Sequence, residues 1–343
     1  MKRLLLLIVS VLLIANGAWA EKFEISGSVN ASEIPAKAGV VLTGNTTIFM
    51  DVNKEVWYIE NKNMSKDYSL TINGGNILTV RGLEIAKTGI NSGDITINAP
   101  VDINTLGTGI RSFKTLTINA NVTVHSLGDK LTAGTAILAD NGVVINSGNV
   151  VLQGAPNGEE SHGIMCKAGS IDIKGGTVVI TAEAKNSYGM WASNNITIDA
   201  NITMSADIGI YAAYDVEIKG GSTSVVSKGD AVYGTNITIN NANVTATGYS
   251  VNGIEAIKKV TINGSTVKVR VGIKGGMHYG IHSNNGDIDI TGSSVDINVK
   301  GDDTSGVYAK GGTIHLSKCS IYLPIGGSVS VSGSNFVDYY GDL

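Results

Sequence analysis

Residues 189–208 read GMWASNNITIDANITMSADI, and residues 209–230 repeat the same plan as GIYAAYDVEIKGGSTSVVSKGD. Each segment begins with a small residue followed by an aliphatic one, a pair that we call the landmark. A few residues later comes an alternating apolar pair, such as Ile196 and Ile198. Because alternation with a period of two marks a strand with one buried face, each segment predicts short β-strands.

The landmark recurs along most of the chain at steps of 20 to 27 residues. Its small residues are Gly89, Gly109, Ala136, Gly163, Gly189, Gly209, Ala231, Gly253, Gly280 and Gly306. An alternating aliphatic pair follows each landmark, and a second pair usually lies beyond a bend rich in Asn, Gly and Ser. One such unit cannot bury its apolar face alone, whereas stacked units form a continuous core.

The repeat predicts an all-β fold, a single-stranded right-handed parallel β-helix of about 10–13 coils with about three short strands per coil. No stretch has the period of an amphipathic helix. We expect residues 21–68 to form an N-terminal cap with irregular first coils. Residues 69–343 should form the β-helix and its C-terminal cap.

The first twenty residues have the pattern of a secretory signal peptide. Lys2 and Arg3 precede the apolar run from Leu4 to Ile14, and Ala18-Trp19-Ala20 is a small-x-small cleavage site. We therefore expect an exported protein that is extracellular, on the cell surface or periplasmic. No later stretch is long and apolar enough to predict membrane insertion after the signal is removed.

The charge of the mature chain argues against nucleic acid as a partner. Loss of Lys2 and Arg3 takes the formal net charge from −4 to −6. Nucleic-acid-binding proteins present basic surfaces, which this composition does not predict.

Two columns follow each landmark. The second residue after the landmark glycine or alanine should face solvent: Asn91, Arg111, Leu138, Met165, Trp191, Tyr211, Tyr233, Glu255, His282 and Tyr308. The next residue should fill a tight interior corner: Ser92, Ser112, Ala139, Cys166, Ala192, Ala212, Gly234, Ala256, Ser283 and Ala309. We call the solvent-facing set the outward column.

Aromatic and imidazole side chains gather in the second half of the outward column. Trp191, Tyr211, Tyr233, His282 and Tyr308 are its candidate ligand-binding residues. A flat strip of rings suits the apolar faces of sugars, and we expect the landmark glycines to leave bare backbone beside it. The alternative is structural, because ring contacts between coils stabilise a solenoid by about 0.5–1.5 kcal/mol per pair.

Catalytic and metal sites have weaker signals. Asp172 and Glu217 should lie two coils apart, about 10 Å, near the upper separation for an inverting carboxylate pair. Asp302 and Asp303, in the loop from Gly301 to Gly306, offer oxygen ligands for calcium, although a polar turn is the favoured explanation. No zinc spacing, nucleophile elbow or phosphate loop is present, so we expect no cofactor apart from this calcium alternative.

The repeat is typified by an alternating aliphatic pair followed by a polar bend, as in Leu70-Thr71-Ile72-Asn73-Gly74-Gly75 and Val260-Thr261-Ile262-Asn263-Gly264-Ser265. Over about residues 70–335 the chain resembles the pectate-lyase-like superfamily of right-handed parallel β-helices, and most of all its bacterial carbohydrate-binding members. That superfamily contains lyases, hydrolases, adhesins and non-catalytic binders, so the resemblance implies a fold rather than one function. The Gly-His-Gly and Arg-Ile-Lys signatures of polygalacturonases are missing, and Ser161-His162-Gly163 is only a fragment.

Three functional hypotheses follow. The first is non-catalytic polysaccharide binding by a secreted or surface β-helix. The second is a polysaccharide lyase or glycoside hydrolase, with Asp172 and Glu217 as its candidate carboxylates. The third is an adhesin or structural solenoid with a protein partner.

Overall fold

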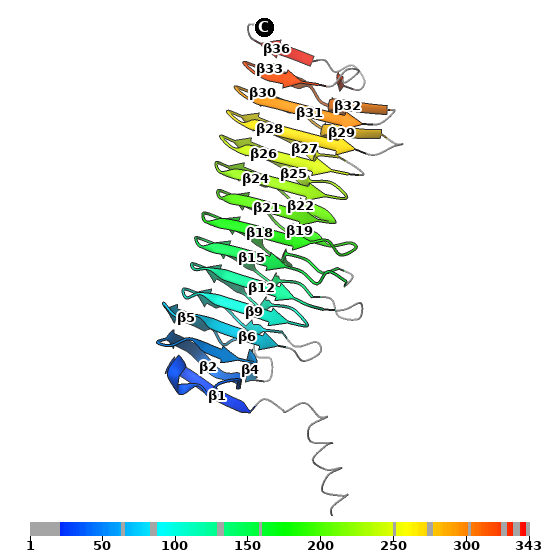
Figure 1. The fold of residues 1–343 in the computed structure, drawn as a ribbon. Helices are drawn as coiled ribbons and strands as arrows, with labels where there is room; N and C mark the ends of the chain where they lie inside the picture. Colours follow the sequence, from blue (N-terminus) through cyan, green and yellow to red (C-terminus); the bar gives the residue numbers. More distant parts are fainter. Residues whose placement is uncertain are drawn as a thin grey trace, which may run out of the picture.

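The computed structural model describes residues 21–62, 66–82, 88–128, 134–157, 160–249, 252–272, 277–300, 303–323, 328–331 and 337–340. They form a parallel β-solenoid of about 11 turns that rises along one axis from the N-terminal to the C-terminal end (Figure 1). The only helical element in the described part is the short 3-10 turn η1 (Ala31–Glu33). The predicted fold class is confirmed, while the right-handed sense stays a prediction.

Most coils contribute three strands in a fixed order, and in some coils the first two strands are continuous. The landmark strands are β4 (Tyr58–Asn61), β7 (Ile90–Ser92), β10 (Ile110–Ser112), β13 (Ile137–Ala139), β16 (Ile164–Cys166), β19 (Tyr188–Ala192), β22 (Ile208–Ala212), β25 (Val232–Asn240), β27 (Ile254–Asn263), β29 (Met277–Ser283), β32 (Asp303–Ala309) and β35 (Val329–Val331). The second strands are β5 (Leu70–Gly74), β8 (Ile95–Ile97), β11 (Thr115–Ile118), β14 (Gly142–Ile145), β17 (Ser170–Ile173), β20 (Ile196–Ile198), β23 (Val216–Lys219), β30 (Ile288–Thr291), β33 (Ile314–Ser317) and β36 (Val337–Tyr340). The third strands are β3 (Lys54–Val56), β6 (Leu78–Gly82), β9 (Val101–Thr105), β12 (Val122–Ser126), β15 (Asn149–Gln153), β18 (Thr177–Ala182), β21 (Asn201–Ala206), β24 (Ser222–Ser227), β26 (Asn243–Gly248), β28 (Thr266–Gly272), β31 (Ser294–Lys300) and β34 (Ser320–Tyr322).

Every strand pairs in parallel with its counterpart in the next coil. The third strands form a 12-stranded sheet, and the landmark and second strands join the first strands, β1 (Lys22–Asn30) and β2 (Gly39–Met50), in a 24-stranded one. The first coils obey the same rule, because β1 pairs with β2, and β2 pairs with both β4 and β5.

The core is the stack of aliphatic residues that the alternation predicts. Ile196, Val216 and Ile237 occupy one register position in successive coils, and all three are buried. The small residues of the predicted interior corner are also buried, from Ser92 to Ala309. Aliphatic side chains stacked at the coil spacing of about 4.8 Å exclude water along the whole axis.

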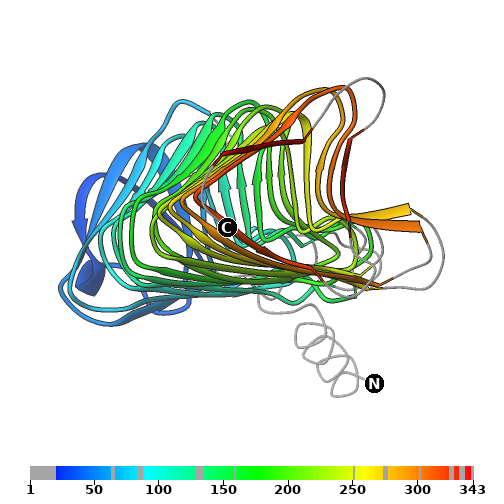
Figure 2. The same ribbon diagram turned by 90° about the horizontal axis from the view of Figure 1, so that it is seen from above.

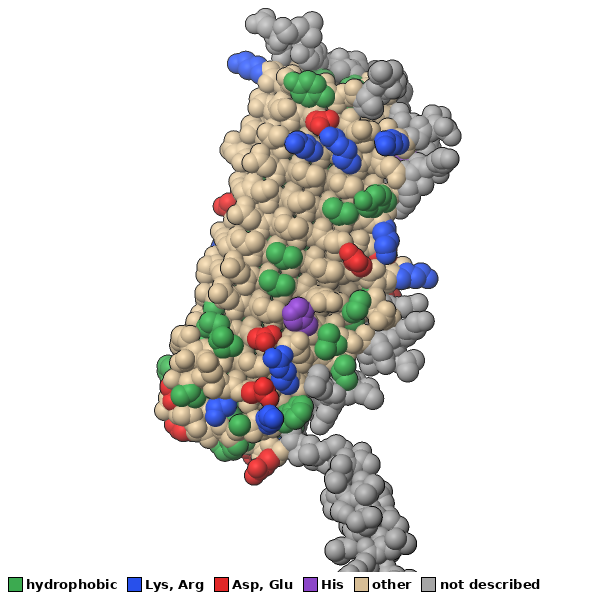
Figure 3. Space-filling model, viewed as in Figure 1, with side chains coloured by type: hydrophobic (Ala, Val, Ile, Leu, Met, Phe, Trp, Pro, Cys, Tyr) green, Lys and Arg blue, Asp and Glu red, His purple; other side chains and the backbone are tan. Residues whose placement is uncertain are grey.

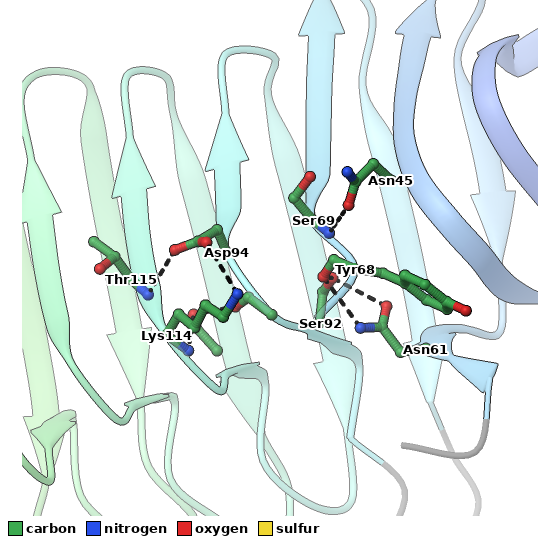
Figure 4. Close-up of polar contacts among 10 residues, drawn as sticks. Asn45, Asn61, Tyr68, Ser69, Ser92, Asp94, Lys114 and Thr115 are labelled. Atoms are coloured by element: carbon green, nitrogen blue, oxygen red, sulfur yellow. Dashed lines mark hydrogen bonds and ion pairs between the residues drawn. The ribbon is translucent and has the colours of Figure 1, made fainter. Parts of the chain in front are cut away.

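Short polar side chains hold the corners in register. Near the N-terminal end, the Asn45 side chain accepts a hydrogen bond from the Ser69 amide at 2.9 Å, and Asp94 accepts one from the Thr115 amide at 3.1 Å (Figure 4). At another corner the Asn119 side-chain nitrogen donates a hydrogen bond to Asn98 Oδ1 at 2.6 Å. Each of these bonds joins one coil to the next, so the bends carry interactions between coils as well as chain reversals.

The solenoid is not round in cross-section. Seen along the axis, its outline is bent, and the starts of β29 and β32 project from it (Figure 2). The face built by the third strands carries mostly short uncharged polar side chains, and charged ones are sparse over its middle (Figure 3). The chemically distinctive side chains lie instead beside the landmark strands.

Candidate ligand-binding face

The structure brings the predicted ligand-binding residues into one column. Trp191 is opposite Tyr211 in the register between β19 and β22, and Tyr211 is opposite Tyr233 in the next coil. The column continues through Glu255 and His282 to Tyr308. The predicted alignment is therefore confirmed, with a carboxylate between two groups of rings.

Trp191, Tyr211 and Tyr233 stack face to face, forming what we call the lower stack. Ring centroids of Trp191 and Tyr211 are 6.5 Å apart with planes at 4°, and those of Tyr211 and Tyr233 are 4.9 Å apart at 5°. The second spacing matches the rise of one coil, about 4.8 Å, as expected for equivalent side chains on successive coils. Each ring of the lower stack therefore has another ring beside it along the axis.

Tyr279, His282 and Tyr308 form an upper stack. The rings of Tyr279 and Tyr308 are 4.7 Å apart with planes at 15°, and those of His282 and Tyr308 are 5.4 Å apart at 23°. Tyr279 and His282 belong to the same coil, and their centroids are only 4.4 Å apart. Tyr279 thus belongs to the face although it is not part of the outward column.

Tyr279 marks a second column, made by the residue immediately before each landmark, which we call the preceding column. Its members beside the stacks are His162, Tyr188, Ile208, Asp230, Asn252, Tyr279 and Ser305. In a straight strand, residues three apart point to opposite faces. The contact between Tyr279 and His282 therefore requires a bend at the landmark, and this bend makes the two columns converge.

The landmark glycines have a different role from the one we expected. A Cβ at Gly253 would overlap the Val269 side chain, and one at Gly209 would lie 2.5 Å from Val225 Cγ1. The open side of these residues thus faces the core, where the bend brings neighbouring coils and side chains too close for a Cβ. The expectation of bare backbone beside the rings is wrong, because the glycines serve the tight interior of the bend.

Two carboxylates flank Asn252 on this face. The Asn252 amide donates to Asp230 Oδ1 at 2.9 Å, and the Asn252 side chain donates to Glu255 Oε2. Glu255 Oε1 accepts a further hydrogen bond from the Asn284 side chain at 2.6 Å. Burial, reinforced by the nearby charge of Glu255, raises the pKa of Asp230 to about 6, although its hydrogen bond from Asn252 opposes the shift.

His282 is buried, with 6% of its surface exposed, and neither ring nitrogen makes a hydrogen bond. Its Nδ1 lies 3.9 Å from Glu255 Oε1, close enough for an ion pair only if the ring is protonated. Burial lowers the pKa of His282, an effect that Glu255 opposes. We infer a neutral imidazole at neutral pH, with one donor and one acceptor unsatisfied.

His162 begins the aromatic part of the preceding column. Its Nδ1 accepts a hydrogen bond from the Tyr188 amide at 3.0 Å, which assigns the remaining proton to Nε2. Burial lowers the pKa of His162 to about 4, so it is uncharged at neutral pH. The residue connects coils in the same way as Asn45 and Asp94 do at the corners.

The candidate catalytic carboxylates lie on the second strands, away from the stacks in sequence. Asp172 and Glu217 are two coils apart, with Thr197 between them in the register. Each pairs with a lysine of its own coil: Asp172 with Lys174 at 3.1 Å and Glu217 with Lys219 at 2.9 Å. These exposed ion pairs resemble ordinary surface chemistry.

The calcium candidates receive little structural information. Asp302 lies outside the described residues, and Asp303 is placed only as the first residue of β32. In the part of the chain that the structure describes, no group of three or more His, Cys, Asp or Glu side chains could hold a metal ion. Within the same residues no helix is long and apolar enough to cross a bilayer.

Asp230, Asn252 and Asn284 are members of the face that the sequence analysis did not identify. Asp230 and Asn252 precede landmarks, so reading that column beside the outward one would have placed them next to Tyr233 and Glu255. Asn284 has no comparable signal, because it belongs to neither column and contacts Glu255 from the neighbouring coil.

No protein-family model, no curated protein and no solved structure matches this chain. The chain is therefore described by its fold, a parallel β-solenoid, and by the chemistry of its own residues.

Proposed function

We propose that this chain is an exported protein that binds polysaccharide without cleaving it, through the face formed by the outward and preceding columns. The supporting observation is the continuous register of rings, amides and carboxylates over successive coils from β16 to β32, in which Trp191, Tyr211, Tyr233, Glu255 and Tyr308 are half-buried. A regular polymer suits such a regular ladder, because each coil offers one more set of contacts along the axis. The likeness of the repeat to carbohydrate-binding β-helices points the same way.

The stacked geometry specifies how the face would meet a sugar chain. Trp191, Tyr211 and Tyr233 are half-buried, so part of each ring is accessible from solvent. The ring surface and the tyrosine hydroxyls suit apolar contacts and hydrogen bonds with a sugar chain. Aromatic residues combine an apolar body with a polar tip, a common basis of carbohydrate and interface recognition.

No observation on the described residues favours catalysis. Asp172 and Glu217 are each paired with a lysine, and they do not converge with the rings in register. The hydrolase or lyase alternative and the protein-binding alternative are therefore outcomes of the test below.

The test is retention of the mature chain, residues 21–343, on a panel of soluble and insoluble polysaccharides, with the supernatant assayed for released sugar. We expect retention without release. Replacing Trp191, Tyr211 and Tyr233 together by alanine should lower retention at least about tenfold, equivalent to about 1.4 kcal/mol.

The matched control replaces three exposed tyrosines outside the columns, Tyr214, Tyr249 and Tyr322, by alanine. It should retain glycan like the parent, provided both variants keep the parent's circular dichroism spectrum. Sugar release would favour the enzymatic alternative. Absence of retention on every glycan would overturn the proposal and leave the protein-binding solenoid.

A further inference from the structure

The outward side of the third strands, which we call the third-strand face, lacks charged groups in its middle and carries them toward both ends (Figure 3). The six consecutive strands β12, β15, β18, β21, β24 and β26 contain no Asp, Glu, Lys or Arg. Their outward positions hold mainly Thr, Ser, Asn and Val. A centre depleted of charge, with charged groups beyond it, is the composition typical of a protein–protein interface.

The charges at the two ends of this face follow the same order along the axis. At the N-terminal end, Arg81 on β6 comes first and pairs with Asp102 on β9 at 3.3 Å. At the C-terminal end, Lys268 and Arg270 on β28 come first, and Arg270 pairs with Asp296 on β31 at 2.5 Å. Each end therefore has a cationic level followed by an anionic one, and the six strands lie between them.

This order of charges is complementary to its own reverse. Consider a second copy laid face to face on the first, related by a two-fold axis that runs parallel to the strands between β18 and β21. The level of β9 then lies opposite β28, and the level of β6 lies opposite β31. Asp102 thus faces Lys268 of the second copy, and Arg81 faces the level of Asp296. With the two solenoid axes in the same direction, every charge would face its own counterpart instead.

The register places the facing charges in one column. Asp102 and Lys268 occupy equivalent outward positions, connected from coil to coil through Thr203 near the centre. Rotation about an axis parallel to the strands keeps each residue in its column, so Asp102 and Lys268 meet without sideways displacement. Lys268 is exposed and makes no ion pair with the described residues, while Asp296 beside it is bound by Arg270.

The ten strands from β6 to β31 offer enough surface for a stable dimer. At about 4.8 Å per coil they extend about 43 Å along the axis, and a strand of five residues is about 17 Å long. The face therefore presents roughly 700 Å² from each copy, or about 1,500 Å² in total. Stable and specific interfaces bury about 1,200–2,000 Å² in total.

We infer that the third-strand face binds a second copy of this chain in the antiparallel arrangement, which gives a two-fold symmetric dimer. Short side chains of the middle strands pack at its centre, and the charged levels align the copies at both ends. The landmark strands belong to the other sheet, so the dimer does not use the proposed glycan-binding face. The inference goes beyond polysaccharide binding and does not depend on it.

The test is sedimentation velocity of the mature chain, residues 21–343, over a series of concentrations at low and at high salt. We expect a dimer that dissociates more readily at high salt, because salt screens the facing charges. Thr203→Arg puts two guanidinium groups close to the two-fold axis and should raise the dimer Kd at least about a hundredfold. The matched control is Thr117→Arg on β11, in the other sheet, which should leave the dimer Kd within about twofold of the parent.

A charge exchange tests the antiparallel arrangement. Lys268→Glu faces Asp102 of the second copy twice in each dimer, so it should raise the dimer Kd at least about tenfold. Adding Asp102→Lys restores opposite charges at both contacts and should bring the dimer Kd back to within about threefold of the parent. Circular dichroism and thermal unfolding of every variant, compared with the parent, separate loss of the dimer from loss of the fold.

Each contrary outcome overturns a stated part of the inference. A parent chain that is monomeric at every concentration would overturn the dimer, and a dimer that Thr203→Arg leaves intact would overturn the third-strand face. Failure of the charge exchange to restore association would overturn the antiparallel arrangement. A series of ever larger species would contradict a closed two-fold dimer. Glycan retention by monomeric Thr203→Arg would show that the proposed function stands without the dimer.

Discussion

The outward column changes character halfway along the solenoid. In the N-terminal half, Arg111 forms an ion pair with Asp140 at 2.7 Å and lies over the Phe113 ring at 5.0 Å, and Leu138 and Met165 follow it in register. In the C-terminal half the same position carries the lower stack, Glu255, and the His282 and Tyr308 rings of the upper stack. The strands, register and buried corner are common to both halves.

The comparison separates scaffold from chemistry. The coil supplies a position every 4.8 Å or so along the axis, whatever side chain fills it. The aromatic and acidic content of β19 to β32 is therefore not required by the fold, since the N-terminal coils form without it. This is the physical reason for assigning function to side chains rather than to the solenoid.

The largest effect should come from breaking the common scaffold, with equal results in both halves. At Gly109 a Cβ would overlap Val124 and approach the Ala136 carbonyl, and at Gly209 it would meet Val225 and Ala231. We expect Gly109→Val and Gly209→Val each to destabilise the protein by about 3 kcal/mol, because the bend cannot accommodate the added volume. Denaturant unfolding measures both, and a cost at only one of them would contradict a shared bend.

A smaller effect should distinguish the electrostatics of the two halves. The pKa of Asp230 is raised to about 6, above the unfolded value of 3.8, so its contribution to stability falls as pH rises from about 4 to 6. Asp230→Asn removes the titrating carboxyl and with it this pH-dependent loss of stability. Its stability relative to the parent should therefore improve by about 2 kcal/mol between pH 4 and pH 7 in thermal or denaturant unfolding.

Asp51 in the N-terminal coils is the control with opposite sign. Hydrogen bonds from the Ser32 hydroxyl and amide lower the pKa of Asp51, so it stabilises the protein above pH 3.8 and loses that effect on acidification. Asp51→Asn should thus cost stability at neutral pH and less at low pH. The stability difference between variant and parent should change with pH in opposite directions for Asp230→Asn and Asp51→Asn. A change in the same direction would contradict the raised pKa of Asp230.

The smallest effect should separate rings from hydroxyls within the lower stack. Among the described residues the hydroxyls of Tyr211 and Tyr233 have no hydrogen-bond partner, so Tyr211→Phe with Tyr233→Phe should change stability by less than about 0.5 kcal/mol. Loss of one hydrogen bond to a glycan is worth about 0.5–1.5 kcal/mol, or roughly two- to tenfold in retention. Unchanged glycan retention would show that recognition depends on the rings and Glu255 and not on the tyrosine hydroxyls.

Most of the fold was predictable because the solenoid is nearly one-dimensional. Ile95, Ile97 and their counterparts could be assigned to the core from alternation alone, and they are buried. Coil lengths also placed Trp191, Tyr211 and Tyr233 in one column, since parallel pairing keeps equivalent positions opposite each other.

Orientation within the candidate site was not predictable in the same way. Alternation places Trp191 and Tyr211 outside the core, but it does not determine whether a ring presents its face or its edge. The bend at the landmark was also not predicted. Gly209 and Gly253 suggested open backbone, whereas a Cβ at either position would overlap neighbouring atoms of the interior. Asp230 was missed for the same reason, since only the bend brings the preceding column beside the outward one.

Because the strands pair in register from coil to coil, the position of a side chain along the axis is fixed in steps of one coil. Glu255 lies one coil after Tyr233 and one coil before His282, so a whole number of coils separates the two stacks. Duplication or loss of a coil would lengthen or shorten the spacing between recognition elements in fixed increments while the core closes as before. The spacing of recognition residues on such a surface can therefore change by the gain or loss of coils, while the contacts within each coil stay the same.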